Sequence, residues 1–133
     1  MNWRFIEARI LKTMISFISH LSFEKEAAKL KRRFSHLDKA LESFKMLCEL
    51  QFHPLDPQQI IAPAKLHRVT RNDTWSIWKV ELAVPRLKPN QFPRIWFAVK
   101  GSNIAFLCVT SHIDNYNDNQ INRVANERVS DIF

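Results

Sequence analysis

The sequence predicts a single α+β domain, and three observations support this class. Its 133 residues are 46% hydrophobic and 25% charged, which is the balance of one compact domain with a modest core. Apolar residues recur at helical spacing in the first third and near the C-terminus, whereas runs of β-branched and aromatic residues fill the part between. The connections between these runs are too short for crossover helices, so we expect antiparallel strands.

The chain begins with a predicted strand and two predicted helices. Residues 13–20, TMISFISH, have the composition of a strand. A helix over about 23–33 follows, with Ser22 as its N-cap. Ser35, with Asp38 three residues later, predicts the start of a second helix, whose apolar face carries Leu37, Leu41, Phe44 and Cys48. We expect these two helices to form a hairpin.

A proline-rich loop over residues 53–63 separates the helices from the predicted sheet, because proline restricts the residue before it and cannot donate a hydrogen bond. Strand-like segments follow at residues 65–69, 75–84, 94–100 and 103–111. A C-terminal helix begins at about Asp118, with an aspartate as its cap and a stripe of Ile121, Val124, Ala125, Arg128 and Ile132. The expected architecture is an N-terminal strand and a helical hairpin on a small antiparallel sheet, with the helices packed on one face.

The charge of the chain indicates an anionic partner. Its formal charge of +7 and pI near 9.8 favour nucleic acid, an anionic membrane surface or an acidic protein. A solvated basic surface with no dedicated partner is the alternative. The single glycine excludes a glycine-rich phosphate loop, which needs several positions without Cβ.

Cysteine usage and the N-terminus indicate a cytoplasmic protein. Cys48 and Cys108 lie in apolar patterns, where a free thiol acts as a small hydrophobe, so we expect a reducing compartment. No histidine pairs with cysteine at metal-ligand spacing, and we expect no metal and no cofactor. No apolar run approaches the roughly 20 residues of a membrane span. Residues 1–12 contain Glu7 and lack the features of a signal peptide.

Two basic residues of the predicted sheet are candidates for chemistry on a phosphate. Strand alternation places Ile95 and Phe97 on one face and Arg94 on the other, and it places Lys79 on the polar face of the preceding strand. A cationic pair on rigid strands can hold a phosphodiester and stabilise the charge that develops when it is attacked. The alternative is that Lys79 pairs with Glu81 or a helix acid and that Arg94 is solvated.

His112 and Tyr116 follow the last predicted strand and are the candidates for proton transfer and for positioning. A histidine near its ordinary pKa of ~6.5 can move protons, and a tyrosine can donate a hydrogen bond or stack on a base. A structural histidine in a turn is the alternative reading of His112.

The order and sequence of these segments resemble those of the RelE/ParE superfamily of bacterial toxins. The segments are FEKEAAKLKRRF and LDKALESF, then WKVEL, then RIWFAVKGSNIAFLCVTSH with a tyrosine soon after, and they cover roughly residues 13–116. The resemblance implies the toxin half of a toxin–antitoxin pair. Many members are mRNA endonucleases that act on the ribosome, so the resemblance also implies inhibition of translation.

The resemblance assigns a role to each candidate residue. Arg94 and Lys79 would stabilise charge, His112 would transfer protons and Tyr116 would stack on or position a base, while the 2′-hydroxyl of the mRNA attacks the adjacent phosphate. Ile113, which is followed by Asp114 and Asn115, stands where many relatives have an arginine or lysine directly after the histidine. Other basic residues would then supply RNA binding: Arg68, Arg71, Lys100, Lys29, Arg32 and Arg33. Residues 1–12 form an extension without a counterpart, ahead of one toxin domain over 13–133.

Two alternatives to the nuclease remain open. A non-catalytic gyrase inhibitor of the ParE kind shares the expected fold, and Ile113 and Asp114 favour it. A basic nucleic-acid-binding module without catalysis is the other alternative. The resemblance implies a cognate antitoxin and ribosome-bound mRNA as partners, and it leaves open a homodimer or a toxin–antitoxin hetero-oligomer.

Overall fold

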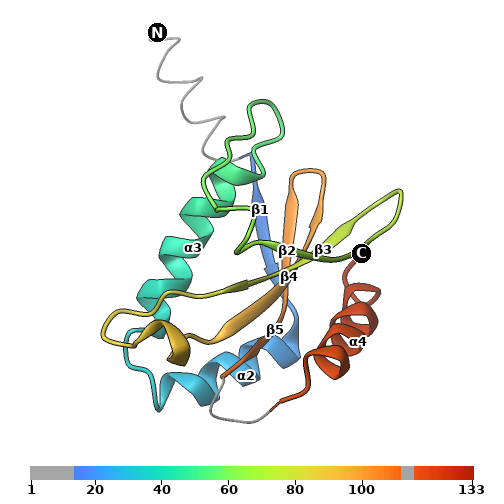
Figure 1. The fold of residues 1–133 in the computed structure, drawn as a ribbon. Helices are drawn as coiled ribbons and strands as arrows, with labels where there is room; N and C mark the ends of the chain where they lie inside the picture. The colour runs from blue at the N-terminus through green and yellow to red at the C-terminus, as the bar shows by residue number, and fades with distance from the viewer. Residues whose placement is uncertain (1–13, 112–115) are drawn as a thin grey trace, which may run out of the picture.

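The computed structural model describes residues 14–111 and 116–133 (Figure 1). It contains β1 (Ser16–Ser19), α2 (Leu21–Lys31), α3 (Leu37–Gln51), β2 (His67–Arg71), β3 (Ser76–Glu81), the 3-10 turn η1 (Pro89–Gln91), β4 (Arg94–Lys100), β5 (Asn103–Thr110) and α4 (Asp118–Val129). The expected α+β class, with an N-terminal strand, a helical hairpin and a C-terminal helix, is confirmed. The predicted extension over 1–12 lies outside the described residues.

The five strands form one mixed sheet in the order β1-β5-β4-β3-β2. The pairs β2–β3, β3–β4 and β4–β5 are antiparallel, as their short connections predict. Gly101, the single glycine of the chain, has φ +56° in the tight turn between β4 and β5. The pairing of β1 with β5 is parallel, so the sheet is not antiparallel throughout. This parallel pair is feasible because most of the domain connects the two strands.

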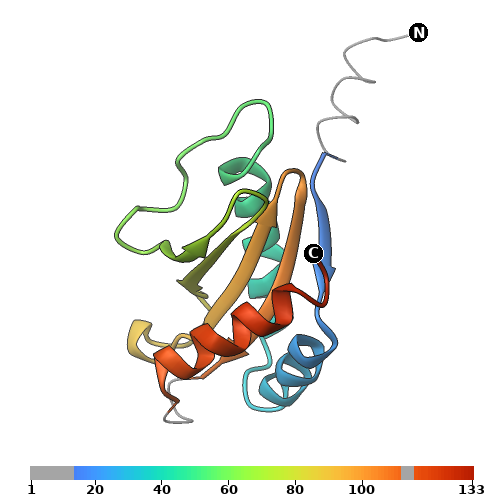
Figure 2. The same ribbon diagram turned by 90° about the vertical axis from the view of Figure 1, so that its right-hand side faces the viewer.

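Helices cover both faces of the sheet. Ile95 and Phe97 of β4 face the core beneath α2 and α3, whereas Trp96 and Ala98 face α4. The predicted alternation along β4 is therefore confirmed. The expectation that the helices share one face is wrong, because α4 packs on the side of the sheet opposite α3 (Figure 2). Each face thus buries its own apolar side chains.

The helix caps differ from the predicted ones by a residue or two. His20, not Ser22, caps α2, and its Nδ1 accepts a hydrogen bond of 3.0 Å from the backbone N–H of Ser22. Asn117 caps α4, and Asp118 is the first helical residue. An imidazole or an amide can accept a backbone N–H as a serine or aspartate does, so composition alone does not select among neighbouring cap candidates.

The start of α3 also differs from its prediction. His36 precedes the helix and makes no side-chain capping hydrogen bond. The start signal at Ser35 thus lies two residues before Leu37, the first helical residue. Asp38 forms an ion pair of 2.6 Å with Lys31 of α2, which joins the two helices of the hairpin.

A β-bulge in β5 changes which face its last residues present. Trp96 pairs with Cys108 and Phe97 pairs with Phe106, so Leu107 is an extra residue in β5. Leu107 and Cys108 both pack on the α4 side. The bulge consequently turns Thr110, the partner of Arg94 in β4, toward the same face as Arg94.

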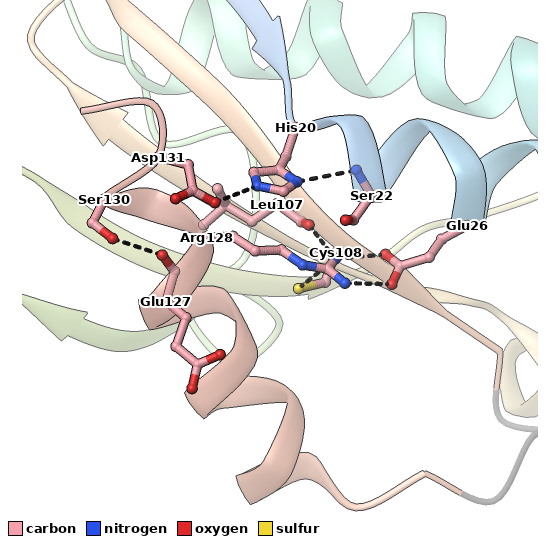
Figure 3. Close-up of polar contacts among 9 residues, drawn as sticks. All are labelled: His20, Ser22, Glu26, Leu107, Cys108, Glu127, Arg128, Ser130 and Asp131. Atoms are coloured by element: carbon pink, nitrogen blue, oxygen red, sulfur yellow. Dashed lines mark hydrogen bonds and ion pairs between the residues drawn. The ribbon is translucent and has the colours of Figure 1, made fainter.

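An ion pair fixes the bulge to the helices on both sides (Figure 3). Arg128 of α4 donates two hydrogen bonds of 2.9 Å to the carboxylate of Glu26 in α2. The same guanidinium donates to the carbonyl oxygen of Leu107 at 2.7 Å, while Glu26 accepts from the backbone N–H of Val109 at 3.3 Å. Backbone groups at the bulge are thereby satisfied by this pair. The predicted α4 stripe is confirmed, with Arg128 as its polar member.

Candidate anion-binding site

Lys79 and Arg94 meet on the α4 face of the sheet, as the strand alternation predicts. In the register of β3 and β4, Lys79 lies opposite Trp96, and Arg94 lies opposite Glu81. Both side chains reach Asp118 at the start of α4. Lys79 Nζ lies 3.1 Å from Asp118 Oδ2, and Arg94 Nη1 donates to the same oxygen at 2.7 Å. Two cations from neighbouring strands therefore converge on a single oxygen atom.

The environment of Asp118 keeps it ionised. Partial burial alone would raise the pKa of this carboxyl. The hydrogen bonds and positive charges of Lys79 and Arg94 outweigh that effect, so the pKa of Asp118 lies below its ordinary value. Because the side chains of Lys79 and Arg94 are only 19% and 21% exposed, the attraction is screened less than at an open surface.

Glu81 adds a second carboxylate to the cluster. Its Oε1 lies 3.4 Å from Nη2 of Arg94. The two cations, Lys79 and Arg94, are thus matched by two carboxylates, Asp118 and Glu81. This arrangement agrees with the alternative in which Lys79 pairs with a helix acid. It departs from that alternative at Arg94, which is paired and not solvated.

Tyr116 lies beside this cluster, between β5 and α4. Its ring packs edge-on against Trp96, with 6.0 Å between the ring centres. Burial raises the pKa of the Tyr116 hydroxyl, which therefore stays protonated near neutral pH. Trp96 in turn donates a hydrogen bond of 2.8 Å to Asn122 of α4. The tyrosine is thus held at the site as a potential donor. The predicted proton-transfer residue His112 lies outside the described residues.

His67 belongs to the same face and was not predicted as a site residue. It pairs with Lys79 in the register of β2 and β3, and its side chain is exposed. Directly opposed residues in antiparallel strands have Cβ atoms about 4.5–5.5 Å apart, which places an imidazole beside the lysine. This pairing depends on the register of the β2–β3 hairpin. The sequence does not define that register, because it does not define the length of the turn between the two strands.

The other predicted RNA-binding residues lie apart from Lys79 and Arg94. Arg68 and Arg71 extend from β2 on the opposite face, because they pair with Trp78 and Ser76. The ammonium of Lys100 lies 5.6 Å from the centre of the Phe133 ring, near the C-terminus. The remaining three, Lys29, Arg32 and Arg33, are exposed at the C-terminal end of α2. The structure therefore divides the predicted basic surface into separate patches.

No protein-family model, curated protein or solved structure matches this chain. Within residues 14–111 and 116–133, no three histidine, cysteine, aspartate or glutamate side chains are grouped so as to hold a metal ion. Over the same residues, no helix is long and apolar enough to cross a membrane. The side chains of the site themselves therefore define its chemistry.

Proposed function

We propose that this protein is a RelE-like toxin that cleaves mRNA on the ribosome and so inhibits translation. The observation that carries the proposal is the convergence of Lys79 and Arg94 on one carboxylate oxygen, at 3.1 and 2.7 Å. A non-bridging phosphate oxygen has the same charge and hydrogen-bonding capacity as that oxygen. An RNA phosphodiester that displaces Asp118 would therefore meet two preorganised donors.

The proposed reaction is an attack by the RNA on its own backbone. The 2′-oxygen forms a bond to the adjacent phosphorus, and the bond from phosphorus to the 5′-oxygen of the next nucleotide breaks. The products are a 2′,3′-cyclic phosphate and a free 5′-hydroxyl. One proton leaves the 2′-hydroxyl and another is delivered to the 5′-oxygen, steps that we assign to His112 with His67 as a second candidate. Lys79 and Arg94 stabilise the charge on phosphorus-bound oxygens.

The test is primer extension on mRNA in programmed ribosomes incubated with the purified protein. We expect new cuts that are lost with Arg94→Ala and His112→Ala. Lys39→Ala is the matched control, because Lys39 is an exposed cation on α3, on the other face of the sheet. Uncut mRNA with a folded protein would contradict the proposal.

A non-catalytic gyrase inhibitor of the ParE kind is the second candidate. It is favoured by the two carboxylates, Asp118 and Glu81, which balance the charges of Lys79 and Arg94. A site without net charge attracts a phosphate less strongly than a bare cationic pair. A DNA supercoiling assay with purified gyrase separates the candidates, since only the inhibitor blocks supercoiling.

The proposed toxin also implies an antitoxin, and an apolar groove on the α3 side supports such a partner. The groove has a volume of about 530 Å³ and includes Leu47, Ile60 and Phe92. Met46, Leu50 and Leu55 are exposed nearby on α3 and the loop after it. Exposed apolar side chains gathered in this way are typical of a protein interaction surface. We place both partners, the antitoxin and ribosome-bound mRNA, in the cytoplasm.

A further inference from the structure

A second basic surface lies at the β2–β3 hairpin, on the edge of the sheet (Figure 1). In a regular strand, side chains three residues apart point to opposite faces. Arg68 and Arg71 nevertheless share a face, because the register shifts between Arg68 and Thr70. Arg68 pairs with Trp78 and Arg71 pairs with Ser76, and these two residues of β3 lie on one face. The bulge therefore turns both arginines toward the same side as an indole.

The indole of Trp78 is held in a defined orientation against the core. Its Nε1 donates a hydrogen bond of 2.8 Å to the hydroxyl of Ser76. Its ring packs against Phe52, with 5.7 Å between ring centres and planes inclined at 55°. The side chain is only partly buried. An aromatic ring fixed in this way can stack on a ligand without loss of rotamer entropy on binding.

An open hollow of about 390 Å³ is lined by Arg68, Arg71 and Trp78. Its volume falls in the range of roughly 300–1,000 Å³ that small ligands occupy in proteins. Asp73 is the one acidic residue among the described residues that line it. Neither Arg68 nor Arg71 forms an ion pair with any residue in the described part of the chain. The two guanidinium groups are therefore available to an anion from outside.

We infer that this hollow binds single-stranded RNA, with a base on Trp78 and neighbouring phosphates on Arg68 and Arg71. Stacking of bases on aromatic side chains beside a cationic groove is the general mode of single-strand recognition. A duplex cannot present an unstacked base to the indole. Because Lys79 and Arg94 lie on the opposite face, this hollow is separate from the proposed cleavage site. RNA binding in this hollow goes beyond the proposed cleavage of mRNA and does not depend on it.

The test measures binding of the full chain to fluorescently labelled 2′-O-methyl oligouridylate and oligoadenylate of about eight nucleotides. The 2′-O-methyl group prevents attack by the 2′-oxygen, so a failure of the proposed nuclease does not affect the result. We expect Arg68→Gln with Arg71→Gln to weaken binding about tenfold or more. The slope of log affinity against log salt should fall by about 1.4, which is roughly 0.7 for each phosphate that an arginine neutralises in the wild type.

Lys25→Gln with Lys39→Gln is the matched control, because it removes two exposed cations from the helices on the α3 side. A weakening and a change of salt slope equal to those of the arginine pair would overturn the inference. Binding to a base-free polyanion such as polyphosphate, with the same affinity as to RNA, would also overturn it.

Tryptophan fluorescence tests the stacking directly. Trp75 also lines the hollow, so Trp75→Phe is the background for this test. Binding of the oligonucleotide should quench the emission of Trp75→Phe, and adding Trp78→Phe should abolish that quenching. Trp78→Phe keeps an aromatic ring against Phe52, and thermal unfolding checks that the variant is folded. Equal quenching in Trp75→Phe and in the double variant would overturn the assignment of Trp78.

Discussion

Arg94 of β4 donates a hydrogen bond of 2.7 Å to Asp118, the first residue of α4. Lys79 of β3 lies 3.1 Å from the same oxygen, so the first residue of α4 contacts both cations of the candidate site. A negative charge in the first turn also interacts favourably with the helix dipole. An anion that takes the place of that oxygen between Lys79 and Arg94 must therefore displace Asp118.

Asp118→Asn should strengthen the binding of a phosphate or an oligonucleotide at this site. The change removes the competing charge while keeping an oxygen that can accept hydrogen bonds. We expect about fivefold tighter binding, because removing a competing charge at a partly exposed site contributes roughly 1 kcal/mol. The measurement is titration with a 2′-O-methyl dinucleotide at low salt.

Asp131→Asn is the matched control, since Asp131 lies just beyond the other end of α4 and pairs with His20 at 2.8 Å. It removes the same charge without touching Lys79 or Arg94. An equal gain in affinity in both variants would mean that only net charge matters, and no gain in Asp118→Asn would contradict competition by Asp118.

The stability of the domain should fall in acid through Asp118. Its pKa is lower in the folded chain than the ordinary value of 3.8, so the ionised form is favoured by folding. This contribution is present above about pH 4 and is lost as pH falls through the lower folded value. Urea unfolding at about pH 6 and about pH 3 should show a smaller loss of stability in Asp118→Asn. An equal loss in wild type and variant would contradict this linkage.

The pair Arg128–Glu26 should contribute to stability as a unit. Its side chains are 17% and 32% exposed, and it satisfies backbone groups at the β5 bulge. Arg128→Met leaves the carboxylate without its partner and should lower the free energy of unfolding by roughly 2–4 kcal/mol. The double variant with Glu26→Gln should lose less than the sum of the single variants.

The exposed pair Lys45–Glu42, at 3.4 Å, provides the control for that comparison. Lys45→Met should change the free energy of unfolding by less than about 1 kcal/mol. Urea denaturation measures both variants. A loss in Arg128→Met no larger than in Lys45→Met would show that the bulge does not depend on the pair.

Both cysteines should be unreactive in the folded protein. Burial raises the pKa of Cys108 to about 12, although Arg128 opposes the shift, and burial raises the pKa of Cys48 as well. The thiolate is the reactive form, so labelling with a thiol reagent at about pH 8 should be slow and should accelerate in urea. Cys48→Ala isolates the reaction of Cys108. Rapid labelling of that variant without denaturant would contradict the burial of Cys108.

The helices and strands were predictable because their apolar spacing is strong. The partner of β1 and the face that α4 covers were not, since both depend on contacts between distant segments. The two bulges could not be predicted from the sequence either. Nothing in the composition of these strands distinguishes an extra residue at Val69 or Leu107 from a regularly paired one. Each bulge determines the face of the sheet on which a later side chain lies. One bulge places Thr110 on the face of Arg94, and the other places Arg71 on the face of Trp78.

The candidate site was predictable in part. Alternation brought Lys79 and Arg94 to one face, as the structure has them. The sequence indicated Asp118 only as a helix cap. Its contacts with Lys79 and Arg94 depend on where α4 lies on the sheet, which the sequence does not define. His67 was missed because its pairing with Lys79 depends on the hairpin register.

The most direct measurement of the central claim is mass spectrometry of the RNA ends produced on programmed ribosomes. Attack by the 2′-oxygen at a phosphate held by Lys79 and Arg94 predicts a 2′,3′-cyclic phosphate on one fragment and a 5′-hydroxyl on the next. These ends should be produced by the wild type and by Lys39→Ala and should be lost with Arg94→Ala. Intact mRNA in every sample, or ends that persist in Arg94→Ala, would contradict the account.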